Sequence, residues 1–275
     1  MRLIFAVSIA FLPALAAANS ECRFTAERNF DVEASGLSTV AFDLGSSDVV
    51  VEGVPGLARV EVRGRACSSD EAWLDRLTID QNRSGDRLDI TPHDGHDLKA
   101  NWFGSSYAYV DLHVRMPTKL AVTIKSQSGD AQVTNVSALD FDASSGDLIV
   151  NDISGPLAVE VSSGDVRAAD IGTVDIRGTS SGDIRLRDVH GPVDVSRSGS
   201  GDLSFDDVGS VRIGSVGSGD VVIAGAGGDV EIDSIGSGDI NVNDVGGNFR
   251  VGSKGSGDIH HRNVRGTVSV PDEDD

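Results

Sequence analysis

Residues 145–165 read SGDLIVNDISGPLAVEVSSGD, so a Ser-Gly-Asp tripeptide returns after 18 residues. The same tripeptide recurs through the second half of the chain at intervals of 17, 18, 18, 19, 18, 19 and 19 residues. Its aspartates are Asp130, Asp147, Asp165, Asp183, Asp202, Asp220, Asp239 and Asp258. Spacing this regular identifies an internal repeat of 18 to 19 residues.

Within each repeat, apolar and polar residues alternate. Leu148 and Val150 follow one aspartate at alternate positions, and Val174 and Ile176 repeat the pattern later in the next unit. A period of two indicates β-strands with one buried side. No helix-length segment separates the predicted strands. Each whole unit repeats in the same direction, which does not suit an array of up-and-down hairpins. The sequence therefore predicts an all-β, single-stranded β-solenoid (β-helix) with 18–19-residue coils, in which like residues stack into columns.

The repeat also occurs earlier in the chain, because residues 47–57 align with residues 146–156. We expect the solenoid to begin near Ser38, to be interrupted by an N-terminal capping excursion over about residues 66–107, and to resume by Tyr109. Within the excursion, Ser84-Gly85-Asp86 predicts the turn of an ordinary hairpin. Residues 69–76 predict one or two helical turns, with Ser69 as the N-cap.

The N-terminus has the features of a secretory signal peptide. A positive start is followed by an apolar run from Leu3 to Leu15 and by the small residues Ala16-Ala17-Ala18. That run is short for a membrane span, and no second apolar segment follows. We therefore predict an exported protein without a transmembrane anchor, located in the periplasm, at the cell surface or in the medium. Its predicted parts are a signal peptide (1–18), an N-terminal segment with the first coils (19–125), the regular solenoid (126–270) and an acidic tail (271–275).

The two cysteines predict a disulfide, and the net charge argues against two kinds of partner. In an exported chain, Cys22 and Cys67 are most simply a disulfide. Acidic residues outnumber basic ones by 43 to 23, for a formal net charge of −20. This balance argues against a nucleic-acid partner and against docking on anionic lipid, since both rest on Lys and Arg.

The stacked Ser-Gly-Asp aspartates have two interpretations. In the structural one, Gly supplies a left-handed backbone angle at the corner and Asp accepts backbone N–H groups in a local Asx-turn. In the other, the ladder of carboxylates binds cations weakly, with Ca²⁺ as the natural hard ion. We favour the turn and assign no cofactor and no specific metal site. A second column would serve the next corner in the same way: Asn135, Asp152, Asp170, Asp188, Asp207, Asp244 and Asn263.

Aromatic residues gather in and beside the excursion: Trp73, Trp102, Phe103, Tyr107 and Tyr109. Such rings are candidates for binding a sugar or a partner protein. They are also suited to covering strand edges at the end or flank of the solenoid, which is the interpretation we favour.

A modest basic band lies in the middle of the repeat region: Arg167, Arg185, Arg187, Arg197 and Arg212. Beside neighbouring acids, these residues are most simply cross-strand charge pairs, with ligand binding as the alternative.

The Ser-Gly-Asp units, behind a signal peptide and a Cys-bearing N-terminal segment, resemble a bacterial family described as "β-strand repeat-containing" or "putative adhesin". The resemblance covers about residues 30–270. It implies a β-solenoid associated with the cell envelope and brings no catalytic residues.

Two functions remain in competition. The first is a non-catalytic exported envelope protein, either an adhesin or a structural scaffold, whose partner is a protein or glycan of the cell surface or envelope. The alternative is a carbohydrate-binding or carbohydrate-active β-helix protein that uses the aromatic excursion. A fold alone does not choose between them.

Overall fold

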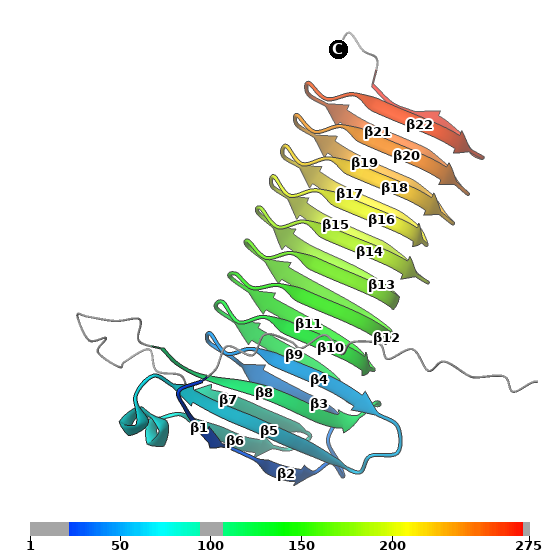
Figure 1. The fold of residues 1–275 in the computed structure, drawn as a ribbon. Coiled ribbons are helices and arrows are strands. Elements are labelled where there is room, and N and C mark those ends of the chain that lie inside the picture. The colour runs from blue at the N-terminus through cyan, green and yellow to red at the C-terminus, as the bar shows by residue number, and fades with distance from the viewer. Residues whose placement is uncertain (1–21, 94–106, 272–275) are drawn as a thin grey trace, which may run out of the picture.

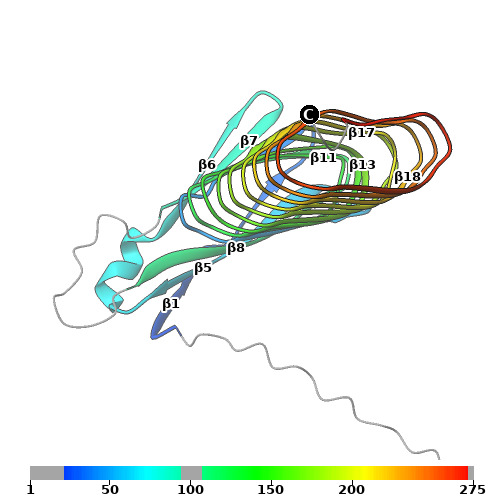
Figure 2. The ribbon, with the colours of Figure 1, turned by 90° about the horizontal axis from the view of Figure 1, so that it is seen from above.

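The computed structural model describes residues 22–93 and 107–271. The predicted signal peptide and residues 272–275 of the acidic tail lie outside these ranges. The chain forms stacked coils of about 19 residues, each flattened into two faces (Figures 1 and 2). The predicted β-solenoid is therefore confirmed.

Each face is a stack of parallel strands. Along the stack, face 1 contains β8 (Ala108–Pro117), β4 (Val49–Val54), β10 (Ala131–Val136), the first part of β12 (Leu148–Val161), the first part of β13 (Val166–Thr179), β14 (Ile184–Val189), β16 (Leu203–Val208), β18 (Val221–Ala226), β20 (Ile240–Val245) and β22 (Ile259–Val264). Face 2 contains β7 (Arg87–His93), β3 (Thr39–Asp43), β9 (Ala121–Ser126), β11 (Ala138–Ala143), the second parts of β12 and β13, β15 (Val193–Ser198), β17 (Val211–Val216), β19 (Val230–Ile235), β21 (Phe249–Lys254) and β23 (Val268–Ser269).

The core fills the narrow space between the two faces. In β12, the inward residues Leu148, Val150 and Ile153 of face 1 and Leu157 and Val159 of face 2 are at most 1% exposed. Their in-register neighbours continue the same apolar columns through the following coils. Full burial of each such side chain contributes about 1.5–3 kcal/mol, so the columns hold the faces together.

The N-terminal end of the stack does not follow the order of the sequence. The first coil, β3–β4, lies between β7–β8 on one side and β9–β10 on the other. Only residues 118–120 separate β8 from β9, so the chain passes the first coil to continue the stack.

Antiparallel strands close this end. On face 1, β5 (Arg59–Ser68) pairs with β8, and β1 (Phe24–Glu27) and β2 (Phe30–Glu33) pair with β5. On face 2, β6 (Thr78–Ser84) and β7 form a hairpin around Gly85. The predicted hairpin is thus confirmed, and it projects from the side of the stack in Figure 2.

A short helix and a disulfide complete the closed end. The 3₁₀ helix η1 (Glu71–Arg76) begins after Asp70, whose carboxylate accepts the N–H of Ala72 at 3.0 Å. The prediction of Ser69 as the N-cap is therefore wrong. The Cys22–Cys67 disulfide is confirmed, across 45 residues of sequence. No helix within the described ranges has the length and hydropathy that a membrane span requires.

The Ser-Gly-Asp glycines are required for a different reason from the one expected. Of the eight, only Gly146 has a positive φ, at 113°. At Gly182, a Cβ atom would overlap the carbonyl oxygen of Gly164 in the coil before it. The glycines therefore permit backbone to pack directly on backbone between coils.

The left-handed corners belong to the second column. Its seven members have φ between 51° and 59°: Asn135, Asp152, Asp170, Asp188, Asp207, Asp244 and Asn263. Gly225 takes the same place in the coil between Asp207 and Asp244, with a φ of 80°. Asn and Asp are the non-glycine residues that tolerate this region best, which explains the column.

Candidate binding surfaces

The Ser-Gly-Asp carboxylates form a continuous hydrogen-bond ladder between coils. Oδ1 of Asp147 accepts the main-chain N–H of Asp165 at 2.9 Å, and Oδ1 of Asp165 accepts that of Asp183 at 3.1 Å. The same bond joins every successive pair from Asp48 to Asp258. The expected acceptor role is present, but the donor lies one coil later instead of in a local turn.

The first aspartate of the ladder has an unusual environment. Burial raises the pKa of the Asp48 carboxyl, and the hydrogen bond from the N–H of Asp130 opposes that shift. The negative charges of Asp130 and Asp111 raise the pKa of Asp48 further.

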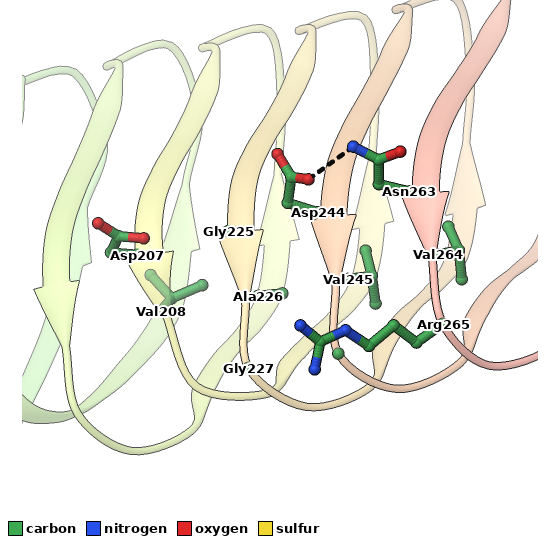
Figure 3. Close-up of a pocket in the computed structure, with 11 residues that line it drawn as sticks. Asp207, Val208, Gly225, Ala226, Gly227, Asp244, Val245, Asn263, Val264 and Arg265 are labelled. Carbon is green, nitrogen blue, oxygen red and sulfur yellow. Dashed lines mark hydrogen bonds between the residues drawn. The ribbon is translucent and has the colours of Figure 1, made fainter.

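The left-handed column borders a groove of about 670 Å³ near the C-terminal end (Figure 3). Gly225 holds the position between Asp207 and Asp244 in the column and has no side chain. The two neighbouring carboxylates, Asp207 and Asp244, are therefore two coils apart, about 9–10 Å along the stack. Asp244 also accepts a hydrogen bond from Asn263 at 2.8 Å. Asp207 and Asp244 are therefore too far apart to chelate one ion. In residues 22–93 and 107–271, no group of three His, Cys, Asp or Glu side chains is placed to hold a metal.

Two of the predicted aromatic residues contact the segment just before β1. The Tyr107 hydroxyl accepts the N–H of Arg23 at 3.0 Å, and the Tyr109 hydroxyl lies 3.6 Å from Sγ of Cys22. Trp73 is half-buried on η1. These contacts join the tyrosines to Cys22 and Arg23, and the covering of strand edges favoured above stays a prediction. Trp102 and Phe103 lie outside the described residues, and ligand binding by this aromatic group stays a prediction.

The basic band is divided between the two faces. Arg212 lies on face 2 and bonds Glu231 at 2.6 Å and Asp233 at 2.8 Å, in the next coil. This is the expected cross-strand charge pairing. Arg197 is also on face 2. Arg167, Arg185 and Arg187 lie together on face 1, which the sequence pattern did not separate from the rest.

These three arginines surround a hollow of about 450 Å³ on the outer side of face 1. Arg167 pairs in register with Arg185, and Ala169 pairs with Arg187. Of these four paired residues, Ala169 has the smallest side chain, and it leaves space beside the guanidinium groups. We call this feature the arginine groove. Its two ends are marked by Ile149 and Val222, which are 42% and 41% exposed.

The sequence pattern of the family described as Toastrack DUF4097 matches residues 59–208, more than half of the chain. The chain belongs to the Toastrack DUF4097 family. The match spans β5 to β16, which includes β5–β8 of the closed end and the three arginines of the arginine groove. The resemblance noted from the Ser-Gly-Asp units is confirmed at the level of the family.

Several solved bacterial proteins have a similar chain course. A putative adhesin from Bacteroides fragilis is 12% identical, with 90% of this chain and 98% of that chain covered and a TM-score of 0.37. A putative lipid binding protein from Parabacteroides distasonis is 17% identical, with 90% and 97% covered and a TM-score of 0.42. A putative cell adhesion protein from Clostridium sporogenes is 13% identical, with 90% and 99% covered and a TM-score of 0.33. Identities this low and TM-scores below 0.5 carry no information about function. A comparison with curated proteins found no match.

Proposed function

We propose that this chain is a non-catalytic, extracytoplasmic adhesin-like β-solenoid that attaches to a component of a cell surface or envelope. The observation that carries the proposal is the use of its carboxylates. Seven of the eight Ser-Gly-Asp side chains, from Asp130 to Asp239, accept a main-chain N–H of the next coil, as Asp202 does from Asp220 at 2.9 Å. The acids are thus spread evenly along the stack instead of converging on one reacting group, as a hydrolase site requires.

Two further features support the proposal. The Cys22–Cys67 disulfide fits an oxidising compartment, in agreement with the predicted signal peptide. The coils leave long outer faces, while the closed end is occupied by its own strands and by η1. A stiff body with extended surfaces is suited to binding, whereas enzyme sites usually lie in a concave, walled cleft.

Attachment can be measured with the purified full-length chain, fluorescently labelled, on isolated bacterial envelopes. We expect saturable retention that excess unlabelled protein displaces. Absence of saturable retention on every envelope tried would contradict the proposal. A parallel incubation with neutral and acidic glycans should leave their chain lengths unchanged, and any depolymerisation would favour the carbohydrate-active alternative.

A further inference from the structure

The two outer surfaces of the solenoid differ in charge. Face 1 carries two columns of Asp and Asn residues, the Ser-Gly-Asp ladder and the left-handed column. Between these columns, on β10, β12–β14, β16, β18, β20 and β22, the outward residues include four arginines and one acid: Arg167, Arg185, Arg187, Arg262 and Asp206. The corresponding strands of face 2 have seven outward acids and four outward arginines: Asp140, Asp142, Glu160, Asp175, Asp194, Glu231 and Asp233, with Arg177, Arg197, Arg212 and Arg250. The strip of face 1 between these two columns is therefore basic, although the aspartates of the columns border it on both sides and the net charge of the chain is −20.

Within face 1, the arginines of the groove have donors to spare. Arg167 bonds Asp165 at 2.8 Å and Arg185 bonds Asp183 at 2.9 Å, each through one terminal nitrogen. A guanidinium carries five N–H donors, so most of them remain for a ligand. The Arg187 side chain is 70% exposed, and its ion-pair partner, Asp206, is 3.8 Å away, beyond hydrogen-bond distance.

The groove also presents acceptors among these donors. Asp206 pairs in register with Arg187, and Ser204 with Arg185. Asn151 lines the hollow on the other side. A ligand with only negative charges would meet Asp206 and the ladder carboxylates of Asp165 and Asp183. A ligand that carries both carboxylates and hydroxyl groups would bond the guanidinium groups and the acceptors together.

The backbone of face 1 excludes a peptide strand as the natural occupant. The strands on both sides of β13 and β14 are paired in register, so their main-chain groups are already bonded within the sheet. β-strand addition needs an open sheet edge, and the arginine groove lies on the surface of the sheet.

We propose that the arginine groove binds a linear acidic polysaccharide, with a sugar carboxylate held by Arg185 and Arg187 beside Ala169. The chain would run along the stack from the coil of Ile149 to that of Val222, and its hydroxyl groups would meet Ser204, Asp206 and Asn151. This proposal rests on the proposed function and names the ligand class and its site.

The test is a titration of the full-length protein with size-defined oligogalacturonate, which has one carboxylate and free hydroxyl groups on each sugar. We expect saturable binding that weakens at least tenfold in Arg185→Gln/Arg187→Gln. The matched control, Arg212→Gln/Arg250→Gln, removes the same charge from face 2, where both arginines bond Glu231, and should bind like the wild type. Ala169→Tyr fills the hollow without a change of charge and should also weaken binding. Melting curves establish that each variant is folded.

Several outcomes would overturn the proposal. One is equal binding by the groove variant and the control variant. Another is equal binding of polyglutamate or of phosphatidylglycerol vesicles, which would reduce the effect to charge or to a lipid surface. A third is binding of neutral dextran with the same affinity. Retention of the groove variant on envelopes at the wild-type level would refute this site while leaving the proposed function intact.

Discussion

The main-chain N–H of Asp239 donates a 2.9 Å hydrogen bond to Oδ1 of Asp220, one coil earlier in the stack. Asp220 in turn donates its own N–H to Asp202. We expect Asp220→Ala to lower the free energy of unfolding by about 1 kcal/mol, because it removes one acceptor. Asp220→Asn keeps an acceptor and removes repulsion from the neighbouring carboxylates, so its stability should equal or exceed that of the wild type. Chemical denaturation of the three proteins checks this, and equal losses for Asn and Ala would contradict it.

Close backbone packing at the Ser-Gly-Asp glycines predicts that two glycine-to-alanine substitutions in the same coil differ strongly in their effect on stability. In Gly219→Ala, the new methyl group would overlap the carbonyl oxygen of Gly201. Overpacking of this kind should cost about 3 kcal/mol and lower the melting temperature by on the order of 10 °C. In Gly227→Ala, the nearest atom is the carbonyl oxygen of Val208 at 3.7 Å, an ordinary contact. We expect thermal melting to show little change for Gly227→Ala, and similar melting of both variants would refute the packing explanation.

The left-handed corner at Asp188 can be tested by side-chain shape. Its φ is 53°, a region in which a β-branched residue is strained. Asp188→Val should therefore destabilise the fold by about 1–2 kcal/mol. Asp188→Gly should be close to neutral, since glycine adopts this angle without a steric cost. Equilibrium unfolding in urea measures both, and a valine variant as stable as the glycine variant would argue against a left-handed corner.

The raised pKa of Asp48 predicts a pH-dependent stability. A carboxyl whose pKa is higher in the folded state binds its proton more tightly there than in the unfolded chain. Ionisation of Asp48 therefore removes stability as the pH rises through the folded pKa. Asp48→Asn keeps the acceptor for Asp130 and carries no charge, so its melting temperature at neutral pH should exceed that of the wild type. The difference should shrink on acidification, as the pH falls through the raised pKa of Asp48 and the wild-type carboxyl becomes protonated. A difference independent of pH would show that the charge is not responsible.

Weak calcium binding along the ladder remains a proposal, and it predicts a small effect. Because the backbone already bonds the ladder carboxylates from Asp48 to Asp239, a chelator should leave the melting temperature unchanged. Calcium near its dissociation constant would add only about 0.4 kcal/mol. Differential scanning calorimetry with EDTA and with millimolar calcium tests this, with magnesium as the control for ionic strength. A large fall in the melting temperature with EDTA would instead reveal a structural calcium site.

The repeat made the coil predictable from sequence, but not the contacts between coils. Alternation at Leu148 and Val150 predicts a buried strand side because that pattern is local. The partner of Asp165, by contrast, is the N–H of Asp183, and only the stacked structure brings the two together. For the same reason, sequence reasoning assigned the left-handed angle to glycine, although its neighbours in space require glycine for packing and Asp188 has the positive φ.

The candidate site was less predictable because it depends on which face each residue joins. Arg185 and Arg212 belong to one basic band in the sequence, yet lie on opposite faces of the solenoid. The exposed Ile149 and Val222 mark the groove only after the register between coils is known. Tyr107 and Tyr109 share a ring contact of 6.1 Å beside the disulfide, and no local motif predicts that contact.

The position of β3–β4 between later strands has a consequence for how the chain folds during synthesis. Every strand that flanks this first coil in the stack is encoded after it, the last ending at Val136. The coil therefore emerges from the ribosome without a surface on which to dock, and its ordering requires contacts of long sequence separation, which form slowly. Growth of the stack cannot start from the N-terminus and proceed coil by coil. The first coil can dock only after the strands up to β10 have been made, so the closed end depends on segments that lie far apart in the sequence.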